Sequence, residues 1–162
     1  MTVATRDFNT PARPGPVVLE HLHNWMERSV QRLDRIWQSQ LCWPLSVEMG
    51  TCDPVYSSHI PDLFSSEVLT HRVELGPHEQ TTLMVCPVPL AIALLNGLIG
   101  EPADALPDPR ELTSVEMALY QQLLEHVADS FRKGWSGDGA PALHPQGRVN
   151  LNDDELGLLQ SE

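Results

Sequence analysis

Histidine, cysteine and acidic residues are the side chains of this chain that could hold a metal ion or attack a substrate. His21 and His23 stand two residues apart on an expected helix, so they point about 200° away from each other and cannot share one ion. His71 and His78 flank an expected turn, but neither has a second pair of ligands nearby in sequence. A structural zinc site needs four such ligands at short or helical spacing. The sequence therefore predicts no metal site and no cofactor.

Cys86 is the best placed candidate nucleophile, because it ends an apolar run beside Pro87. Its neighbours Met84, Val85 and Val88 are apolar and raise the pKa of a thiol, which favours an inert core cysteine. The chain has no GxSxG elbow, no glycine-rich phosphate loop and no HExxH motif. The acidic run 153–155 is more simply a solvated segment than a catalytic pair. The sequence gives an enzymatic activity no support.

Composition narrows the possible partners and the compartment. The chain has 162 residues and a formal net charge of -12, so its average surface repels nucleic acid and anionic lipid. No apolar run approaches the roughly 20 residues that span a bilayer. The three cysteines lack CxxC spacing, which favours reduced thiols. We expect a cytoplasmic protein with no nucleic-acid partner and no direct membrane insertion.

Prolines and small polar residues divide the chain into three parts. Residues 1–17 contain Pro11, Pro14 and Pro16 and are predicted to form a flexible arm. Residues 18–137 carry the periodic apolar pattern of one folded domain. Residues 138–162 begin with glycine, proline and alanine and end in acidic residues, which predicts a flexible tail.

The apolar spacing within the domain predicts helices at both ends and strands between them. A long helix starts at Val18 and ends near Leu41, with Trp25 and Trp37 expected in the core. Strands are expected at 45–49, 69–75 and 81–86, the last buried on both faces and paired antiparallel with the one before it. A second helix covers 90–98 and ends at Gly100.

A third helix is expected to begin with a capping box formed by Thr113 and Glu116. Gly134 is its expected terminator. Every fourth residue along this helix is apolar, which predicts one stripe facing the core: Val115, Leu119, Leu123, Val127, Phe131 and Trp135. The fold class that follows is α+β, with long helices packed on a sheet that contains antiparallel strands.

The order of these segments resembles the middle domain of the flagellar motor switch protein FliM, which has a CheC-like fold. The matching segments are the strand 83–85, the helix end and loop 93–100, the helix start 112–116, and the helix 123–135 that ends in Trp135. Leu19 and Glu20 at the start of the first helix and the step 43–48 also fit. The resemblance covers roughly residues 18–137. It implies a non-enzymatic interaction or scaffold protein of a flagellar switch or related type III secretion complex.

The resemblance also implies where partners bind. The family's glycine-rich loop, implicated in contact with the rotor protein FliG, corresponds to Gly97, Leu98, Ile99, Gly100, Glu101 and Pro102. This chain has fewer glycines there than the family. A partial echo of the family's docking peptide for the response regulator CheY lies in the acidic tail, at Leu151, Glu155, Leu156 and Leu159. The implied partners are FliG-like, FliN-like and CheY-like proteins.

Two departures from the family shape the remaining expectations. After the long helix the chain enters a Gly/Pro stretch instead of a second set of strands, so the resemblance implies a half-domain that a second copy could complete as an isologous homodimer. The alternative function is a CheC-like phosphatase acting on a phosphorylated CheY-type regulator. Its acid and amide pair falls nearest to Gln121, Glu125 and Ala128, where the amide is missing. We expect location in the cytoplasm, peripheral at the flagellar basal body.

Overall fold

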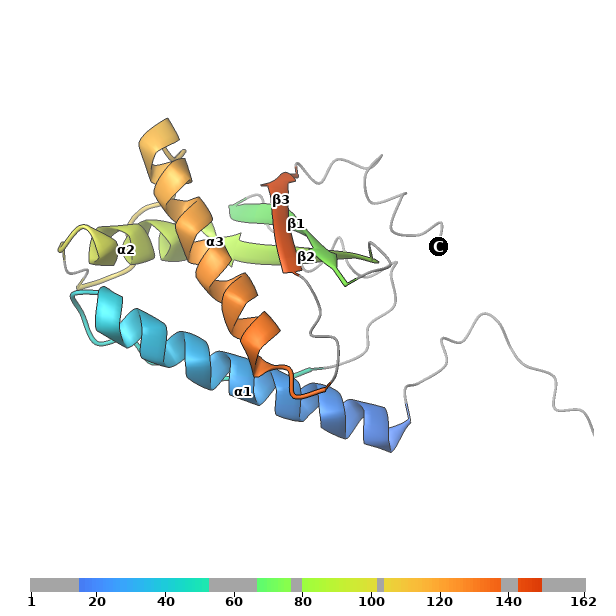
Figure 1. The fold of residues 1–162 in the computed structure, drawn as a ribbon. Helices are drawn as coiled ribbons and strands as arrows, with labels where there is room; N and C mark the ends of the chain where they lie inside the picture. Colours follow the sequence, from blue (N-terminus) through green and yellow to red (C-terminus); the bar gives the residue numbers. More distant parts are fainter. Residues whose placement is uncertain (1–14, 53–66, 77–79, 102–103, 138–142, 150–162) are drawn as a thin grey trace, which may run out of the picture.

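A computed structural model describes residues 15–52, 67–76, 80–101, 104–137 and 143–149 (Figure 1). The elements follow in the order α1, β1, β2, α2, α3 and β3. Their bounds are α1 Pro16–Gln40, β1 Val68–Leu75, β2 Gln80–Pro87, α2 Val88–Leu98, α3 Ser114–Gly134 and β3 Leu143–Arg148. The helices gather beside a three-stranded antiparallel sheet, as Figure 1 shows. The predicted α+β class is confirmed.

The sheet has the order β2-β1-β3, so β1 is central. β1 and β2 form a hairpin whose register runs from Val68 opposite Pro87 to Leu75 opposite Gln80. The predicted antiparallel pairing of these two strands is confirmed. The expectation that 81–86 is buried on both faces is wrong. The side chains of residues 83–86 are only half-buried, so the described elements do not fully cover both faces of β2.

The third strand of the sheet lies in the stretch that composition assigned to a flexible tail. β3 pairs antiparallel with β1, placing Leu143 opposite Leu75 and Val73 opposite Pro145, and the register shifts between His71 and Val73. The prediction of a flexible tail is therefore wrong for residues 143–148. Pro145 and Gly147 weaken the strand pattern locally, but the edge of β1 supplies the hydrogen-bonding partner.

The strand predicted at 45–49 does not join the sheet. Its side chains alternate between half-buried and exposed, as the sequence pattern indicated. However, no described strand pairs with it. Its backbone is attached to α1 instead, because the Val47 amide donates a hydrogen bond to Asp34 Oδ1 at 2.8 Å. The alternating pattern predicts which side chains face inward, but it does not predict which element the segment contacts.

α1 packs against α3, and the contact combines aromatic rings with small residues (Figure 1). The buried residues of α1 are Trp25, Ser29 and Leu33. Trp25 Nε1 donates to the Phe131 carbonyl at 2.7 Å, and Arg28 Nε donates to the Gly134 carbonyl at 3.0 Å. These bonds satisfy carbonyls that the end of α3 leaves free. Trp25 is in the core as predicted, whereas Trp37 is half-buried against it.

The predicted apolar stripe of α3 is only partly correct. Leu123 is buried, but Val115 is 69% exposed and Trp135 is 38% exposed. A spacing of four advances about 400° around the helix, so the stripe drifts by about 40° at each step. The side chains that α3 buries follow mixed steps instead: Tyr120, Leu123, Leu124, Ala128, Ser130 and Gly134.

The core forms where the helices meet the sheet. Leu69 of β1 and Tyr120 of α3 are each 2% exposed, and Ala91 of α2 is fully buried. α2 is apolar nearly all round because α3, the sheet and the 41–45 segment surround it. The buried cluster consists of Leu41, Leu69, Ala91, Leu94, Leu95, Tyr120, Leu123 and Leu124.

Candidate partner-binding surface

The segment after α2 is held in one conformation by its own backbone. Gly100 has a φ of 89°, a left-handed conformation that glycine adopts at least cost. The Glu101 amide donates to the Asn96 carbonyl at 2.8 Å, and the Ile99 amide donates to the Leu95 carbonyl at 3.2 Å. The first of these bonds is the one that defines a Schellman cap. The predicted end of the helix at Gly100 is confirmed, and the segment leaves α2 as a fixed turn.

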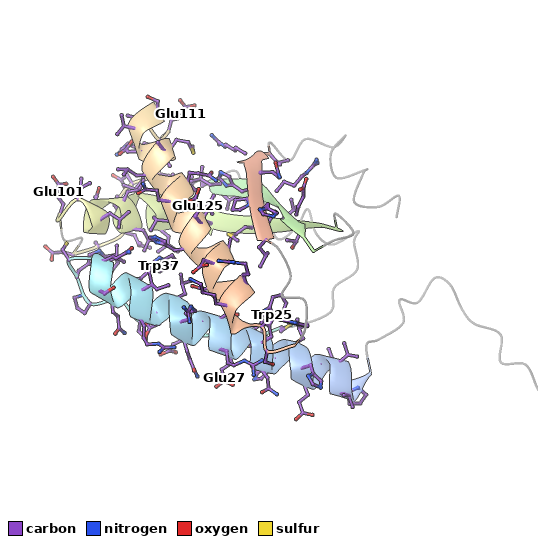
Figure 2. The ribbon with its side chains drawn as sticks, viewed as in Figure 1. Trp25, Glu27, Trp37, Glu101, Glu111 and Glu125 are labelled. Atoms are coloured by element: carbon purple, nitrogen blue, oxygen red, sulfur yellow. The ribbon has the colours of Figure 1, made fainter. Side chains whose placement is uncertain are left out.

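The structure divides the residues predicted to bind a partner into two groups. Ile99 is 60% exposed, and Gly100 and Glu101 are exposed beside it. Figure 2 shows Glu101 at the outer end of α2. Gly97 is buried and Leu98 is half-buried, so these two support the turn from beneath. Pro102 lies outside the described residues. The exposed group is a large apolar side chain on a rigid turn, next to a carboxylate.

Gly97 joins this turn to the chain that follows α1. Its carbonyl accepts a hydrogen bond from the Cys42 amide at 3.1 Å. A Cβ added at Gly97 would lie 2.8 Å from Trp43 Cδ1 and 3.2 Å from Leu41 Cδ2. The indole of Trp43 therefore occupies the space that any larger residue at position 97 would need. The turn rests on the core through this contact.

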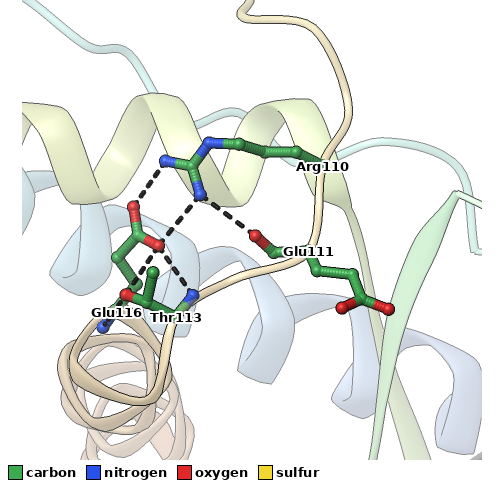
Figure 3. A network of polar contacts seen from close by, with 4 residues as sticks. All are labelled: Arg110, Glu111, Thr113 and Glu116. Carbon is green, nitrogen blue, oxygen red and sulfur yellow. Dashed lines mark hydrogen bonds and ion pairs between the residues drawn. The ribbon is translucent and has the colours of Figure 1, made fainter.

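A polar network fixes the start of α3 (Figure 3). Arg110 donates to both carboxylate oxygens of Glu116, at 2.9 Å and 2.5 Å. Glu116 also accepts from the Thr113 amide at 2.8 Å, and its own amide donates to Thr113 Oγ1 at 3.3 Å. The predicted capping box is confirmed, and Arg110 extends it. The Arg110 guanidinium, together with the two Thr113 donors, lowers the pKa of Glu116 from 4.5 to about 2.

This network predicts a pH dependence of stability. Above pH 4.5 the Glu116 carboxylate is charged in both the folded and the unfolded chain, and its full stabilisation is present. As the pH falls from about 4.5 towards 2, the unfolded chain takes up the proton first, so stability is lost. We expect Glu116→Gln to lower the free energy of unfolding at pH 7 by about 1 kcal/mol, because the network is exposed. The difference from wild type should shrink below pH 4 in urea unfolding.

Glu125→Gln is the matched control for this prediction, since Glu125 is an exposed carboxylate on the same helix and forms no comparable network with the residues that the structure describes. Its stability should follow that of the wild type across the same pH range. A Glu116→Gln protein with wild-type stability at pH 7 would contradict the role of the cap.

The candidate nucleophile and the candidate metal ligands do not assemble a reactive site. Burial raises the pKa of the Cys86 thiol, and the Tyr120 hydroxyl only partly offsets this through a hydrogen bond. His71 is 2% exposed beside Tyr120, and burial and then Arg148 lower its pKa, which favours a neutral imidazole. His21 and His23 are exposed on α1, and His78 lies outside the described residues. The described residues contain no cluster of three or more His, Cys, Asp or Glu placed to hold a metal ion.

The three residues nearest to the phosphatase pattern do not form an exposed acid and amide pair. Glu125 is exposed on α3, Gln121 is half-buried and Ala128 is buried. The position where that pattern needs an amide is thus a methyl group inside the core.

The candidate docking tail, Leu151, Glu155, Leu156 and Leu159, lies outside the described residues. Among the described helices, none has the length and apolar character to cross a membrane.

Further exposed apolar side chains, Leu19 among them, were not predicted as surface. Leu106 is 64% exposed in the segment before α3, and Val17 and Val18 are 65% and 58% exposed at the start of α1. The hydrophobic periodicity of α1 does not indicate this exposure, because the apolar pattern of α1 extends beyond the part of the helix that α3 covers. The exposure of Val17 and Val18 therefore depends on where α3 ends, which is a tertiary property.

Comparison with known proteins places the fold. No protein-family model matches the chain, and no curated protein matches it by sequence. Among solved structures, a chain of the FliG–FliM complex from H. pylori aligns with a TM-score of 0.75 and 14% identity, covering 86% of this chain and 79% of that one. The FliM middle domain from Vibrio alginolyticus aligns with a TM-score of 0.67 and 17% identity, covering 80% and 72%.

The FliM middle domain from H. pylori gives a similar result, with a TM-score of 0.67, 14% identity and coverage of 86% and 77%. These values show that the chain has the fold of a FliM middle domain. The resemblance inferred from the sequence is confirmed at the level of the fold. The expectation of a half-domain is wrong, because the alignments cover 79%, 72% and 77% of the three aligned chains.

Proposed function

We propose that this chain is a non-enzymatic scaffold component of a flagellar motor switch or a related type III secretion complex. The observation that carries the proposal is the FliM middle-domain fold, found over 86% of the chain and shared with a chain of a FliG–FliM complex. Burial raises the pKa of the Cys86 thiol, and the position of α3 where the phosphatase pattern needs an amide is Ala128; both agree with a role in binding alone. Such a protein acts in the cytoplasm, at the periphery of the basal body.

The proposed contact with a FliG-like partner uses the turn from Gly97 to Pro102. Its exposed part offers Ile99 as an apolar anchor with Glu101 at the rim, a common arrangement for binding sites. The Schellman cap holds the turn before binding, so little ordering entropy is lost on association. Leu98 and Gly97 shape the turn without forming its surface. FliN-like and CheY-like proteins are further proposed partners, the latter through Leu151, Glu155, Leu156 and Leu159.

Ile99→Asp tests the proposed contact. We expect it to weaken binding of a FliG-like rotor protein at least tenfold, because a charge would be desolvated where an apolar anchor was buried. Isothermal titration calorimetry with the full chain measures the loss. The fold should be unaffected, since Ile99 is 60% exposed.

Val17→Asp is the matched control, because Val17 is equally apolar and 65% exposed, but lies at the start of α1. It should bind as the wild type does. Equal weakening by both changes would indicate a general charge effect and refute the assignment of the turn. Release of phosphate from a phosphorylated CheY-type regulator by the purified chain would overturn the non-enzymatic proposal.

We also propose an isologous homodimer formed along β2. In the described part of the chain the outer edge of β2 has no partner strand, and β2 contains no charged residue to protect that edge. Light scattering should give a mass near twice 18.0 kDa. Thr82→Lys puts a charge on an exposed position of this strand and should give the monomer. A wild-type monomer at micromolar concentration would contradict the dimer.

The proposed domain boundaries are 18–137 for the FliM-like domain, to which β3 at 143–148 is added through its pairing with β1. Because α1 begins at Pro16, the predicted arm 1–17 is wrong for residues 16–17. Residues 1–15 and the remainder of 138–162 are proposed as flanking segments.

A further inference from the structure

A cavity of about 190 Å³ lies along the strand β2. Its described lining comes from β2 and the three helices, with no contribution from β1 or β3, and is almost wholly apolar. Because β1 pairs with β2 on one side, the cavity lies on the other side, towards the outer edge of β2. Trp37 is the residue that α1 contributes, and Figure 2 shows it on the side of α1 that faces the other two helices.

The side chains around the mouth of the cavity are incompletely covered. Trp37, Met84, Leu90 and Val127 come from four different elements, and each is half-buried, whereas Leu94 is buried at the inner end. Contiguous apolar side chains that remain partly exposed often mark an interaction site. The interface of a stable dimer resembles a protein core cut in half. The cavity has this character, because its inner wall is a finished core and its outer wall is open.

The pairing of the strands shows which face of β2 the cavity adjoins. Met84 lies opposite His71, and Cys86 lies opposite Leu69. Residues opposite one another in an antiparallel pair share a face of the sheet. His71 lies beside the ring of Tyr120, with 5.4 Å between the centroids, so this is the face that α3 covers. The outer edge of β2 and the open side of the cavity are therefore adjacent.

The symmetry of an isologous pair decides where a second copy places its helices. Antiparallel pairing of two β2 strands requires a twofold axis perpendicular to the sheet, because this rotation reverses the strand direction and keeps each face on its own side. The helices of both copies then cover the same face of one continuous sheet. The cavity of each copy opens towards the cavity of the other across the axis.

We propose that the two cavities merge into one apolar core that two copies of this chain share. The inference rests on the proposed dimer along β2 and assigns Trp37, Met84 and Val127 of both copies to the centre of its interface. Neither β2 nor the described lining of the cavity contains a charged residue, so no charge is desolvated there when the copies meet. The negative net charge of each copy stays outside this contact.

Isotope-filtered NMR on a mixture of ¹³C-labelled and unlabelled full chain tests the shared core without a substitution. Nuclear Overhauser contacts between the two copies should arise from the methyl groups of Met84 and Val127. Val115 is the internal control, because it lies on the same helix as Val127 but is 69% exposed and outside the lining of the cavity. Its methyl groups should show no contact with the other copy.

Val127→Lys should raise the dissociation constant of the dimer at least about tenfold in analytical ultracentrifugation, because a charge would be desolvated in the shared core. Val115→Lys is the matched variant and should leave the dissociation constant unchanged. The NMR experiment decides the question even where Val127→Lys lowers the stability of the fold.

The outcomes separate this inference from the dimer on which it rests. A dimer without contacts from Val127, or one that Val127→Lys leaves intact, overturns the shared core but not the pairing along β2. A wild-type chain that is monomeric at micromolar concentration contradicts the dimer itself, and the shared core with it.

Discussion

Gly134→Ala is expected to lower the free energy of unfolding by about 2–3 kcal/mol, which for a chain of this size is a fall in melting temperature of about 5–10 °C. The added Cβ would lie 3.1 Å from the Ser29 backbone nitrogen and 3.2 Å from its Cα, and would collide with Ser29 Oγ. The side-chain oxygen can rotate, but the backbone of α1 cannot move without separating the two helices. Thermal unfolding followed by circular dichroism measures the shift.

The collision also threatens the bonds that join the two helices. Separating α1 from α3 lengthens the bond from Arg28 Nε to the Gly134 carbonyl and the bond from Trp25 Nε1 to the Phe131 carbonyl. Ser29→Gly removes the oxygen but leaves the backbone contacts, so it should rescue Gly134→Ala only in part. Gly147→Ala in β3 is the control, since no atom lies within 4 Å of its added Cβ. Full rescue by Ser29→Gly would show that the helix backbones are not in close contact.

The double role of Gly134 illustrates which features the sequence could predict. Its place at the end of α3 follows from a local rule about glycine, and the helix does end there. The capping box of Thr113 and Glu116 was predicted to the residue for the same reason, because its hydrogen bonds span three residues. The contact between Gly134 and Ser29 spans more than one hundred residues. No local pattern encodes it, although the small side chains on both helices are consistent with it.

The errors in the predicted fold share a cause: each depends on which distant segment of the chain a residue packs against or pairs with, and a local pattern does not specify that segment. β3 has the composition of a loop, and only its pairing with β1 makes it a strand. The segment 45–49 has the pattern of a strand, but its backbone is hydrogen-bonded to Asp34 of α1 and not to a described strand. Val115 continues an apolar repeat, but lies beyond the part of α3 that the core covers. In each case the tertiary environment overrides the local preference.

The candidate partner-binding surface depended on the resemblance to a family more than on physical reasoning. The sequence indicates that Gly100 ends a helix, but it does not indicate that Ile99 is exposed while Leu98 and Gly97 are covered. That difference arises because Trp43 and Leu41 return from the end of α1 and pack over the base of the turn. The resemblance identified the segment, and the structure separates its surface from its support.

Gly97→Ala is the second substitution expected to have a large effect, with a loss of about 2–3 kcal/mol in the free energy of unfolding. The added methyl group would collide with the indole of Trp43 and lie 3.2 Å from Leu41 Cδ2. If Trp43 swings away, the core loses its cover near Leu41, and the bond from the Cys42 amide to the Gly97 carbonyl is strained. Binding through Ile99 should weaken as well, because the turn that presents it rests on this contact.

Trp43→Ala isolates the collision from other effects of the methyl group. Trp43→Ala alone is destabilising, but in that background Gly97→Ala should add less than about 1 kcal/mol, because the two changes act on one contact. Gly100→Ala is the matched control in the same turn. No atom lies within 4 Å of its added Cβ, so its cost comes from the positive φ alone and should be about 1–2 kcal/mol. Strictly additive losses for the pair Gly97→Ala and Trp43→Ala in urea unfolding would show that Trp43 does not support the turn.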